Sequence, residues 1–193
     1  MKKALIGNGG HAKEVMVQMG IKLQTFVEDN YCDDNSLPLS EFNPSVYEVM
    51  VTISDPEIRK RIVSLLPICT KYFTFIHPTS LVMDKNIQIG VGSFVGAYSI
   101  LTTNIIIGKH SILNRGNQIG HDCTTGDFLS MMPGSVISGN VNLGECVYLG
   151  SNSSIKEKVN VCSNVYLGSN ATLVKNIKSR GIFVGVPAKF KSL

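Results

Sequence analysis

A polar stretch in the second half of the chain, LNRGNQIGHDCTTGD at positions 113–127, holds the side chains best suited to acid-base chemistry. Histidine side chains can exchange a proton near neutral pH, so the imidazole of His121 could take a proton from an amine or a hydroxyl as that group attacks a carbonyl carbon. The competing interpretation is a solvated histidine with no chemical role. Which of the two holds depends on what the fold places beside His121.

A second candidate site is the glycine turn GNGGHA at positions 7–12, which follows a short apolar run. It satisfies G-x-G-x-x-A, in which Gly7 makes the turn, Gly9 lets a phosphate approach the backbone and Ala12 permits close helix packing. Asp29 lies 20 residues after Gly9, where an acidic residue would meet a ribose hydroxyl. Both features favour a nucleotide, although a purely structural tight turn has the same short pattern.

The elements that must position these residues change character along the chain. In the first 80 residues we expect strands at KALI, QTFVED, VYEVMVTIS and KYFTFIH, and helices at HAKEVMVQM and PEIRKRIVSLL. Ser54 or Asp55 would cap the second helix. This outline predicts a small α/β unit with a parallel sheet in residues 1–80, and a different architecture in residues 81–193.

From about residue 83 the chain follows a six-residue period. Every sixth residue from Ile89 to Leu173 forms a set of 15 lead residues, of which 13 are Ile, Leu or Val. An amphipathic helix repeats its apolar residues every three to four positions and a hairpin strand every two, so neither explains this rule. The period predicts a coil of short strands with three hexads, or 18 residues, in each turn. A β-sandwich with accidental periodicity is the alternative.

The coil places His121 in a defined position. It is the second residue after the lead Ile119, so we expect its side chain at a corner, pointing outward. The positions one turn away are Thr103 and Gly139. A glycine above an outward histidine would leave space beside the ring and offer a backbone N–H to a developing oxyanion. The coil also leaves no room for the second βαβαβ half of a dinucleotide-dependent dehydrogenase.

Several segments carry a family resemblance, namely IGVGSFVG, IIIGKHSI, VNLGECVYLGSNSSI and the closing VGVPAK. They resemble the left-handed parallel β-helix of hexapeptide acyltransferases. With GNGGHAKEV and NQIGHDCTTGDFLSMMPGSVISG, the whole chain resembles the family of sialic acid O-acetyltransferases and bacillosamine-type sugar N-acetyltransferases. The resemblance implies an α/β half-Rossmann domain that binds a nucleotide sugar, followed by an all-β left-handed parallel β-helix. The left hand comes from the resemblance alone, because the usual crossover rule favours a right hand.

The resemblance also implies a reaction. The chain would be an acetyl-CoA-dependent N-acetyltransferase acting on the 4-amino group of a UDP- or dTDP-linked 4-amino-4,6-dideoxy sugar, for surface glycan synthesis. The amine would attack the thioester directly, with no acyl-enzyme, His121 as general base and Asp122 orienting the imidazole. Asn114 matches a family asparagine that positions substrate or cofactor.

The same resemblance assigns the binding residues. The phosphates of the nucleotide would lie on the glycine turn, and Asp29 would lie near the base or ribose. Coenzyme A would lie in a groove between neighbouring coils of a homotrimer. The turn residues are Gly7, Asn8, Gly9, Gly10 and His11. The residues that would line coenzyme A are Gly139, Ser151, Gly168 and Lys175. Lys175 belongs to a basic C-terminal segment that could instead be only a solvated tail.

Two positions depart from the pattern or stay open. Many relatives carry a second histidine where this chain has Ser130, which puts in doubt any contact to the acetyl group or the sugar at that position. His110 follows Gly108 and Lys109 in an ordinary hexad, so we expect it on the surface.

Two alternatives to the sugar N-acetyltransferase function remain open, a sialic acid O-acetyltransferase and a non-catalytic scaffold that binds nucleotide sugars.

Composition excludes other classes. The net charge of +4 comes from scattered residues without a basic stripe interleaved with aromatics, so nucleic acid is a poor partner. No stretch approaches the roughly 20 apolar residues of a membrane span, and the N-terminal apolar run is too short for a signal peptide. With two histidines in the coil we expect no metal site. The five cysteines contain no CxxC pair, which favours reduced thiols in a cytoplasm.

Overall fold

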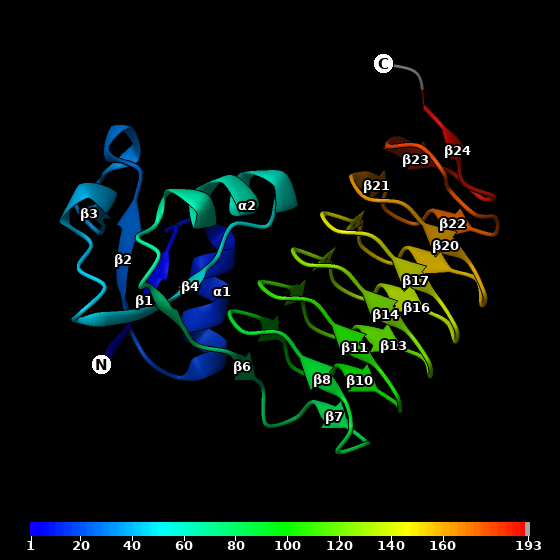
Figure 1. Ribbon diagram of the computed structural model, residues 1–193, viewed down its shortest axis with the longest axis horizontal. Coiled ribbons are helices and arrows are strands. Elements are labelled where there is room, and N and C mark those ends of the chain that lie inside the picture. The colour runs from blue at the N-terminus through cyan, green and yellow to red at the C-terminus, as the bar shows by residue number, and fades with distance from the viewer. Residues whose placement is uncertain (192–193) are drawn as a thin grey trace.

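The N-terminal part is a five-stranded parallel sheet with one helix on each face, as the computed structural model of residues 1–191 shows (Figure 1). The strand order is β3-β2-β1-β4-β5. The elements are β1 (Lys2–Ile6), α1 (Gly10–Met19), β2 (Gln24–Val27), the 3-10 turn η1 (Asp29–Tyr31), β3 (Leu37–Pro38), η2 (Leu39–Glu41), β4 (Tyr47–Val51), α2 (Pro56–Leu65) and β5 (Lys71–Tyr72).

Alternation along the central strands decides which helix covers which face. Ala4 and Ile6 of β1 pack with Ile62 of α2, whereas Leu5 between them packs with Ala12 and Val15 of α1. Side chains of successive strand residues point to opposite faces, so one short apolar strand serves both helices. Helix α1 therefore lies between the sheet and the second part of the molecule (Figure 1).

Local chemistry explains the start of α2 and the end of α1. Asp55 caps α2, its side chain accepting a hydrogen bond of 2.9 Å from the Ile58 N–H, and Pro56 is the first helical residue. Helix α1 ends at Gly20, which has a φ of 67°. In residues 1–191 neither helix is long and apolar enough to cross a membrane.

The second part is a parallel β-helix whose three faces are sheets, which we name in chain order. The first coil sheet contains β6 (Phe75–Ile76), β9 (Phe94–Val95), β12 (Ile112–Leu113), β15 (Ser130–Met131), β18 (Tyr148–Leu149), β21 (Val165–Leu167), β23 (Gly181–Val184) and β24 (Lys189–Phe190). The second coil sheet contains β7 (Leu81–Val82), β10 (Ile100–Leu101), β13 (Gln118–Ile119), β16 (Val136–Ile137), β19 (Ser154–Ile155) and β22 (Thr172–Leu173). The third coil sheet contains β8 (Gln88–Ile89), β11 (Ile106–Ile107), β14 (Thr124–Thr125), β17 (Asn142–Leu143) and β20 (Asn160–Val161).

The register follows the predicted 18-residue turn. Leu101 pairs with Ile119 and Ile119 with Ile137, for example, and the lead residues line one continuous core inside the coil. The first turn contains one extra residue, since Leu81 pairs with Ile100. The β-helix predicted from the period is confirmed.

The junction differs from the expectation in one respect. The segment KYFTFIH forms two strands instead of one, because β5 completes the α/β sheet while β6 pairs with β9 of the coil. The coil thus begins at Phe75, a few residues before the boundary expected at residue 81. The α/β unit covers the lower part of the first coil sheet, where the outward residues Phe94, Ile112 and Ser130 are fully buried.

Candidate functional site

His121 lies on the corner between the second and third coil sheets, just after β13, and 56% of its side chain is exposed. Its carbonyl accepts a hydrogen bond from the Asn140 N–H of the next turn. The 18-residue register places Gly139, Glu157 and Lys175 one, two and three turns further along the coil in the same column. We call His121, Gly139 and Lys175 the His121 corner.

The imidazole of His121 is held by its neighbour in the chain. Its Nδ1 lies 2.7 Å from Oδ2 of Asp122, and Oδ1 of Asp122 accepts a hydrogen bond of 2.6 Å from the side-chain amide of Asn104. The bond from Asn104, together with the one to His121, lowers the pKa of the Asp122 carboxyl. Asp122 is therefore an anion at neutral pH, and it favours the His121 tautomer whose proton is on Nδ1.

The other ring nitrogen faces Gly139. A Cβ atom built on Gly139 would lie 2.5 Å from Nε2 of His121, so any larger residue there would collide with the ring. Glycine at this position leaves space beside the nitrogen that can accept a proton. The His121 corner can thus hold a general base, with the backbone of Gly139 next to it and no side chain in between.

A second group of expected residues lies at a different corner. Asn114, Ser151 and Gly168, which we call the Asn114 corner, follow strands of the first coil sheet and precede the second. Asn114 is buried, its Oδ1 accepts a hydrogen bond from the Arg115 N–H, and its Nδ2 lies 3.4 Å from Oε2 of Glu14 on α1. In one chain the whole width of the second coil sheet separates this corner from His121.

The glycine turn opens into a crevice of about 260 Å³ beyond the carboxyl ends of β1, β2 and β4. Gly7, with a φ of 106°, makes the turn, and Cβ atoms built on Gly9 or Gly10 would touch nothing within 4 Å. Asn8 lies at the rim and donates a hydrogen bond to Asp33. In a parallel sheet this edge, next to a helix N-terminus, suits a phosphate-bearing ligand.

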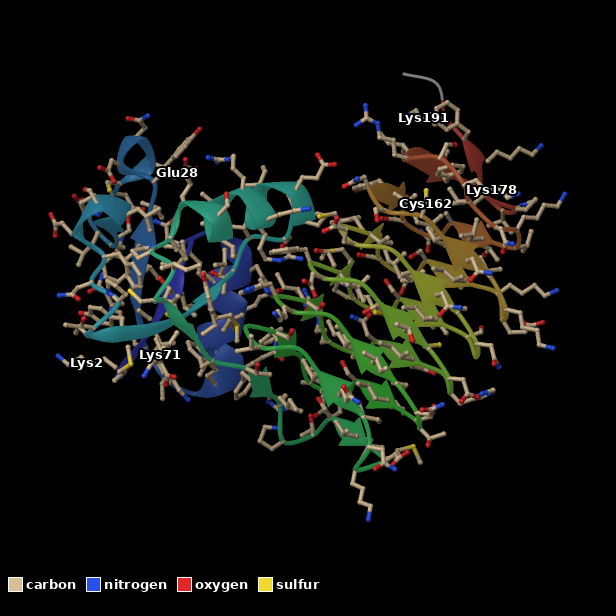
Figure 2. All side chains as sticks on the ribbon, in the orientation of Figure 1. Lys2, Glu28, Lys71, Cys162, Lys178 and Lys191 are labelled. Atoms are coloured by element: carbon tan, nitrogen blue, oxygen red, sulfur yellow. The ribbon has the colours of Figure 1, made fainter. Side chains whose placement is uncertain are left out.

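The acidic residue on the crevice wall is Glu28 instead of Asp29. Asp29 begins η1 and accepts a hydrogen bond of 3.1 Å from the Ser40 N–H, so its carboxylate stabilises a loop. Glu28 pairs with Arg61 at 2.7 Å, and Figure 2 shows it beside α2, on the side of the α/β unit away from the coil. The spacing from Gly9 predicted the correct strand end, but the 3-10 turn η1 changes which of the two neighbouring carboxylates faces the crevice.

His11 contributes differently from the glycines beside it. Its side chain is buried against Phe94 of the coil, with ring centroids 5.3 Å apart, and Glu14 lies 3.8 Å from its Nδ1. Burial lowers the pKa of His11 to about 4, so the imidazole is neutral at physiological pH. Its backbone lies at the start of α1 beside the crevice, while its ring lies in the interface between the two parts of the chain.

The surface position expected for His110 is wrong. Only 6% of it is exposed, because Tyr72 of β5 and Phe128 of the coil enclose its ring. Ser130 is also fully buried, donating a hydrogen bond to the Ser54 carbonyl and accepting one from Arg59. Both residues face outward from the coil, and the docked α/β unit completes their burial, through Tyr72 for His110 and through Ser54 and Arg59 for Ser130.

Sequence reasoning missed Asn104, Glu14 and Arg59. Asn104 had a signal, since it precedes Asp122 by 18 residues and the predicted register places the two side by side. Glu14 and Arg59 had none, because their partners lie 100 and about 50 to 70 residues away in the coil.

No family model matches the chain. The GDP-perosamine N-acetyltransferase of Escherichia coli O157:H7 is 32% identical over 90 residues, which are 46% of this chain. That match spans 40% of the length of the curated relative.

Solved structures match over nearly the whole chain. The acetyltransferase domain of PglB from Neisseria gonorrhoeae FA1090, in complex with acetyl coenzyme A, superposes with a TM-score of 0.85 and 27% identity over 98% of each chain. PerB from Caulobacter crescentus, in complex with CoA and GDP-perosamine, superposes with a TM-score of 0.87 and 24% identity over 100% of this chain and 98% of that one. In sequence and in structure, the relatives of this chain are therefore sugar N-acetyltransferases of the hexapeptide-repeat type, the family that its motifs resemble.

Proposed function

We propose that this chain transfers the acetyl group of acetyl-CoA to the amino group of a nucleotide-linked 4-amino-4,6-dideoxy sugar. The observation that carries the proposal is the His121 corner, where an imidazole is oriented by an anionic carboxylate and faces a glycine. The complexes of similar proteins with CoA, acetyl-CoA and GDP-perosamine support the same substrates.

The chemistry follows from the tautomer that Asp122 favours. With its proton on Nδ1, His121 presents the lone pair of Nε2 to the sugar amine. The amine attacks the thioester carbonyl, the C–N bond forms and the C–S bond breaks, and His121 takes the proton of the amine while the CoA thiolate leaves. The carboxylate of Asp122 stabilises the resulting imidazolium, and the Gly139 N–H is offered to the developing oxyanion.

The nucleotide of the acceptor would lie in the crevice. Its phosphates would contact the backbone of Gly7, Gly9 and Gly10, with Asn8 at the rim. We propose Glu28 as the acidic residue nearest the ribose, since it lines the crevice and Asp29 does not. The sequence favoured UDP or dTDP as carrier, and the relatives that act on or bind GDP-perosamine add GDP as a third candidate.

We propose a homotrimer, because one chain cannot bring its two corners together. Three coils with their second sheets toward a common axis would place the His121 corner of each against the Asn114 corner of the next. Acetyl-CoA would then lie between coils, with Gly139 and Lys175 from one chain and Ser151 and Gly168 from its neighbour. The five free thiols support a cytoplasmic setting for this enzyme of glycan synthesis.

The test is CoA release from acetyl-CoA with GDP-, UDP- and dTDP-linked 4-amino sugars and free sialic acid as acceptors, with the protein's own thiols subtracted. We expect turnover with one nucleotide amino sugar and its loss in His121→Ala. Turnover with sialic acid alone would replace the proposal by O-acetylation. Binding of nucleotide sugars without any turnover would identify a scaffold.

A further inference from the structure

Within residues 1–191, the most deeply buried charged side chain has no role in the reaction described above. Arg59 on α2 is 0% exposed, and its acceptors are carbonyl oxygens and one hydroxyl instead of a carboxylate. Burial lowers the pKa of Arg59 to about 9, which still leaves the guanidinium charged at neutral pH. A buried cation of this kind costs free energy unless its donors are satisfied, so the arrangement calls for an explanation.

The donors of Arg59 divide between the two parts of the chain. Nη1 donates to the carbonyls of Ile53 and Ser54, in the loop that follows β4. Nε donates to the His110 carbonyl at 2.8 Å, and Nη2 donates to the coil residues Phe128, Leu129 and Ser130 at 2.9, 3.0 and 2.8 Å. One side chain therefore ties a loop of the α/β unit to two turns of the coil.

Ser130 closes the same network. Its hydroxyl accepts from Arg59 and donates to the Ser54 carbonyl at 2.7 Å, so a second bond crosses the interface at this point. The hydroxyl is fully buried and both bonds are made within the chain. In this chain residue 130 therefore joins the α/β unit to the coil.

The fastened loop is also part of the crevice. Ile53 lines it, and the Ile53 side chain lies 3.3 Å from a Cβ built on Gly7, directly behind the phosphate turn. We propose that Arg59 and Ser130 are positioning residues that hold the nucleotide crevice at a set distance from the coil, and so align a nucleotide-linked amine with the acetyl donor. This inference rests on the proposed function, since it concerns how the acceptor reaches the same site.

The proposal separates binding in the crevice from alignment with the coil. A nucleoside diphosphate needs only the crevice, whereas acetyl transfer needs the crevice and the coil in register. Lysine at position 59 cannot reproduce a planar fork with five donors. We expect Arg59→Lys to lower kcat/KM for the nucleotide amino sugar by about tenfold or more, with the KM for acetyl-CoA unchanged. The Kd of the corresponding nucleoside diphosphate should change by less than about twofold.

Two further variants control the experiment. Ser130→Ala keeps the carbonyl contacts of Arg59, so it should fold. It should lower kcat/KM by a smaller factor than Arg59→Lys does, with the Kd of the nucleoside diphosphate unchanged. Lys60→Met is the matched control, because Lys60 joins the same helix to the same coil through an exposed pair with Glu145 at 2.8 Å. We expect it to leave every parameter unchanged. Equal effects of Lys60→Met and Arg59→Lys, or nucleoside diphosphate binding lost in step with kcat/KM, would overturn the positioning role.

Amide hydrogen exchange tests, without any turnover, whether Arg59 and Ser130 hold the α/β unit on the coil, a link that we call the clamp. Arg59→Lys should speed exchange in segments 52–59 and 127–131 by about fivefold or more, with no change in Lys60→Met. Unchanged exchange would overturn the clamp. If wild-type protein acetylates none of the sugars but Arg59→Lys still speeds exchange in these two segments, the proposed function fails while the link through Arg59 stands, so the two failures are distinguishable.

Discussion

At the scale of single residues, the proposed role of His121 as a base depends on the open space beside its ring as much as on the histidine itself. Asp122 orients the ring and Gly139 leaves its second nitrogen accessible, so the three residues form one unit. The backbone of Gly139 does not have a positive φ, which means that alanine is sterically acceptable to the main chain. Only the imidazole would have to move.

This geometry gives a prediction for Gly139→Ala. The new methyl group would displace the ring of His121, so kcat should fall by about 100-fold. The unfolding temperature should stay within a few degrees of wild type, because the corner is outside the packed core. Steady-state kinetics and thermal unfolding of the same preparation measure both values. A variant with normal kcat would show that Nε2 of His121 is not the proton acceptor.

His110 gives a prediction about pH. Burial, followed by the nearby charge of Arg59, lowers its pKa to about 4, so the folded chain keeps the ring neutral. Between pH 6.5 and pH 4 the unfolded chain binds a proton at this site and the folded chain does not. The contribution of His110 to the free energy of unfolding is therefore fully present above pH 6.5 and is lost as the pH falls toward 4. Phenylalanine would keep the stacking on Phe128 and remove the titration.

We therefore expect His110→Phe to lose less stability on acidification. From pH 7.5 to pH 5, the wild-type free energy of unfolding should fall by about 2 kcal/mol more than that of the variant. Urea unfolding at both pH values measures the difference, and every other titrating group is common to the two proteins. An identical fall in both would contradict a neutral His110 in the folded state. His11, with a pKa of about 4, should retain part of the dependence in the variant.

At the scale of elements, α2 begins at the point where the crevice loop meets the coil. Asp55 supplies its N-cap, and the hydrogen bond to the Ile58 N–H satisfies one of the free donors of the first turn. The start of the helix sets where Arg59 lies one turn later, so a cap on the surface influences a buried contact. The local sequence narrowed this cap to Ser54 or Asp55, and the structure shows that it is Asp55.

Removal of that cap has a defined expected cost. Asp55→Ala should lower the free energy of unfolding by about 1 kcal/mol, measured by urea denaturation at pH 7. Ser64→Ala is a suitable control on the same helix, since Ser64 is exposed and its hydroxyl bonds only the Arg61 carbonyl. The control should change stability by less than about 0.5 kcal/mol. Equal values for the two variants would mean that the cap contributes nothing specific.

At the scale of the whole molecule, the separation of the two corners in one chain is the basis of the proposed homotrimer. His121 and Asn114 follow strands of different coil sheets, and no rearrangement inside a rigid coil can join them. The proposed trimer solves this by pairing unlike corners of neighbouring chains. Each cleft would then contain one His121 and one Asn114 from different copies.

Mixed assemblies test this directly. His121→Ala and Asn114→Ala should each be nearly inactive alone, whereas trimers refolded from an equal mixture should recover about a quarter of wild-type activity, since one cleft in four receives both intact residues. Mixing the variants without refolding is the control. No recovery in mixed trimers of confirmed composition would place the site within one chain and contradict the shared cleft.

The sequence by itself determined the repeating parts of this protein. The six-residue period predicted the coil, its 18-residue register and the inward direction of the lead residues, because these depend on neighbours a constant distance away in the chain. The same register places His121 beside Gly139, and the cap of α2 and the glycine turn at residues 7–10 are equally local signals.

Only the tertiary structure decided what covers the outer face of the coil. His110 and Ser130 have the outward positions of ordinary hexads, and they are buried because the α/β unit docks on that face through Arg59. The choice of Glu28 over Asp29 at the crevice likewise depends on a turn held by Ser40. These outcomes depend on contacts between segments far apart in the chain, and a pattern of local spacing contains no information about such contacts.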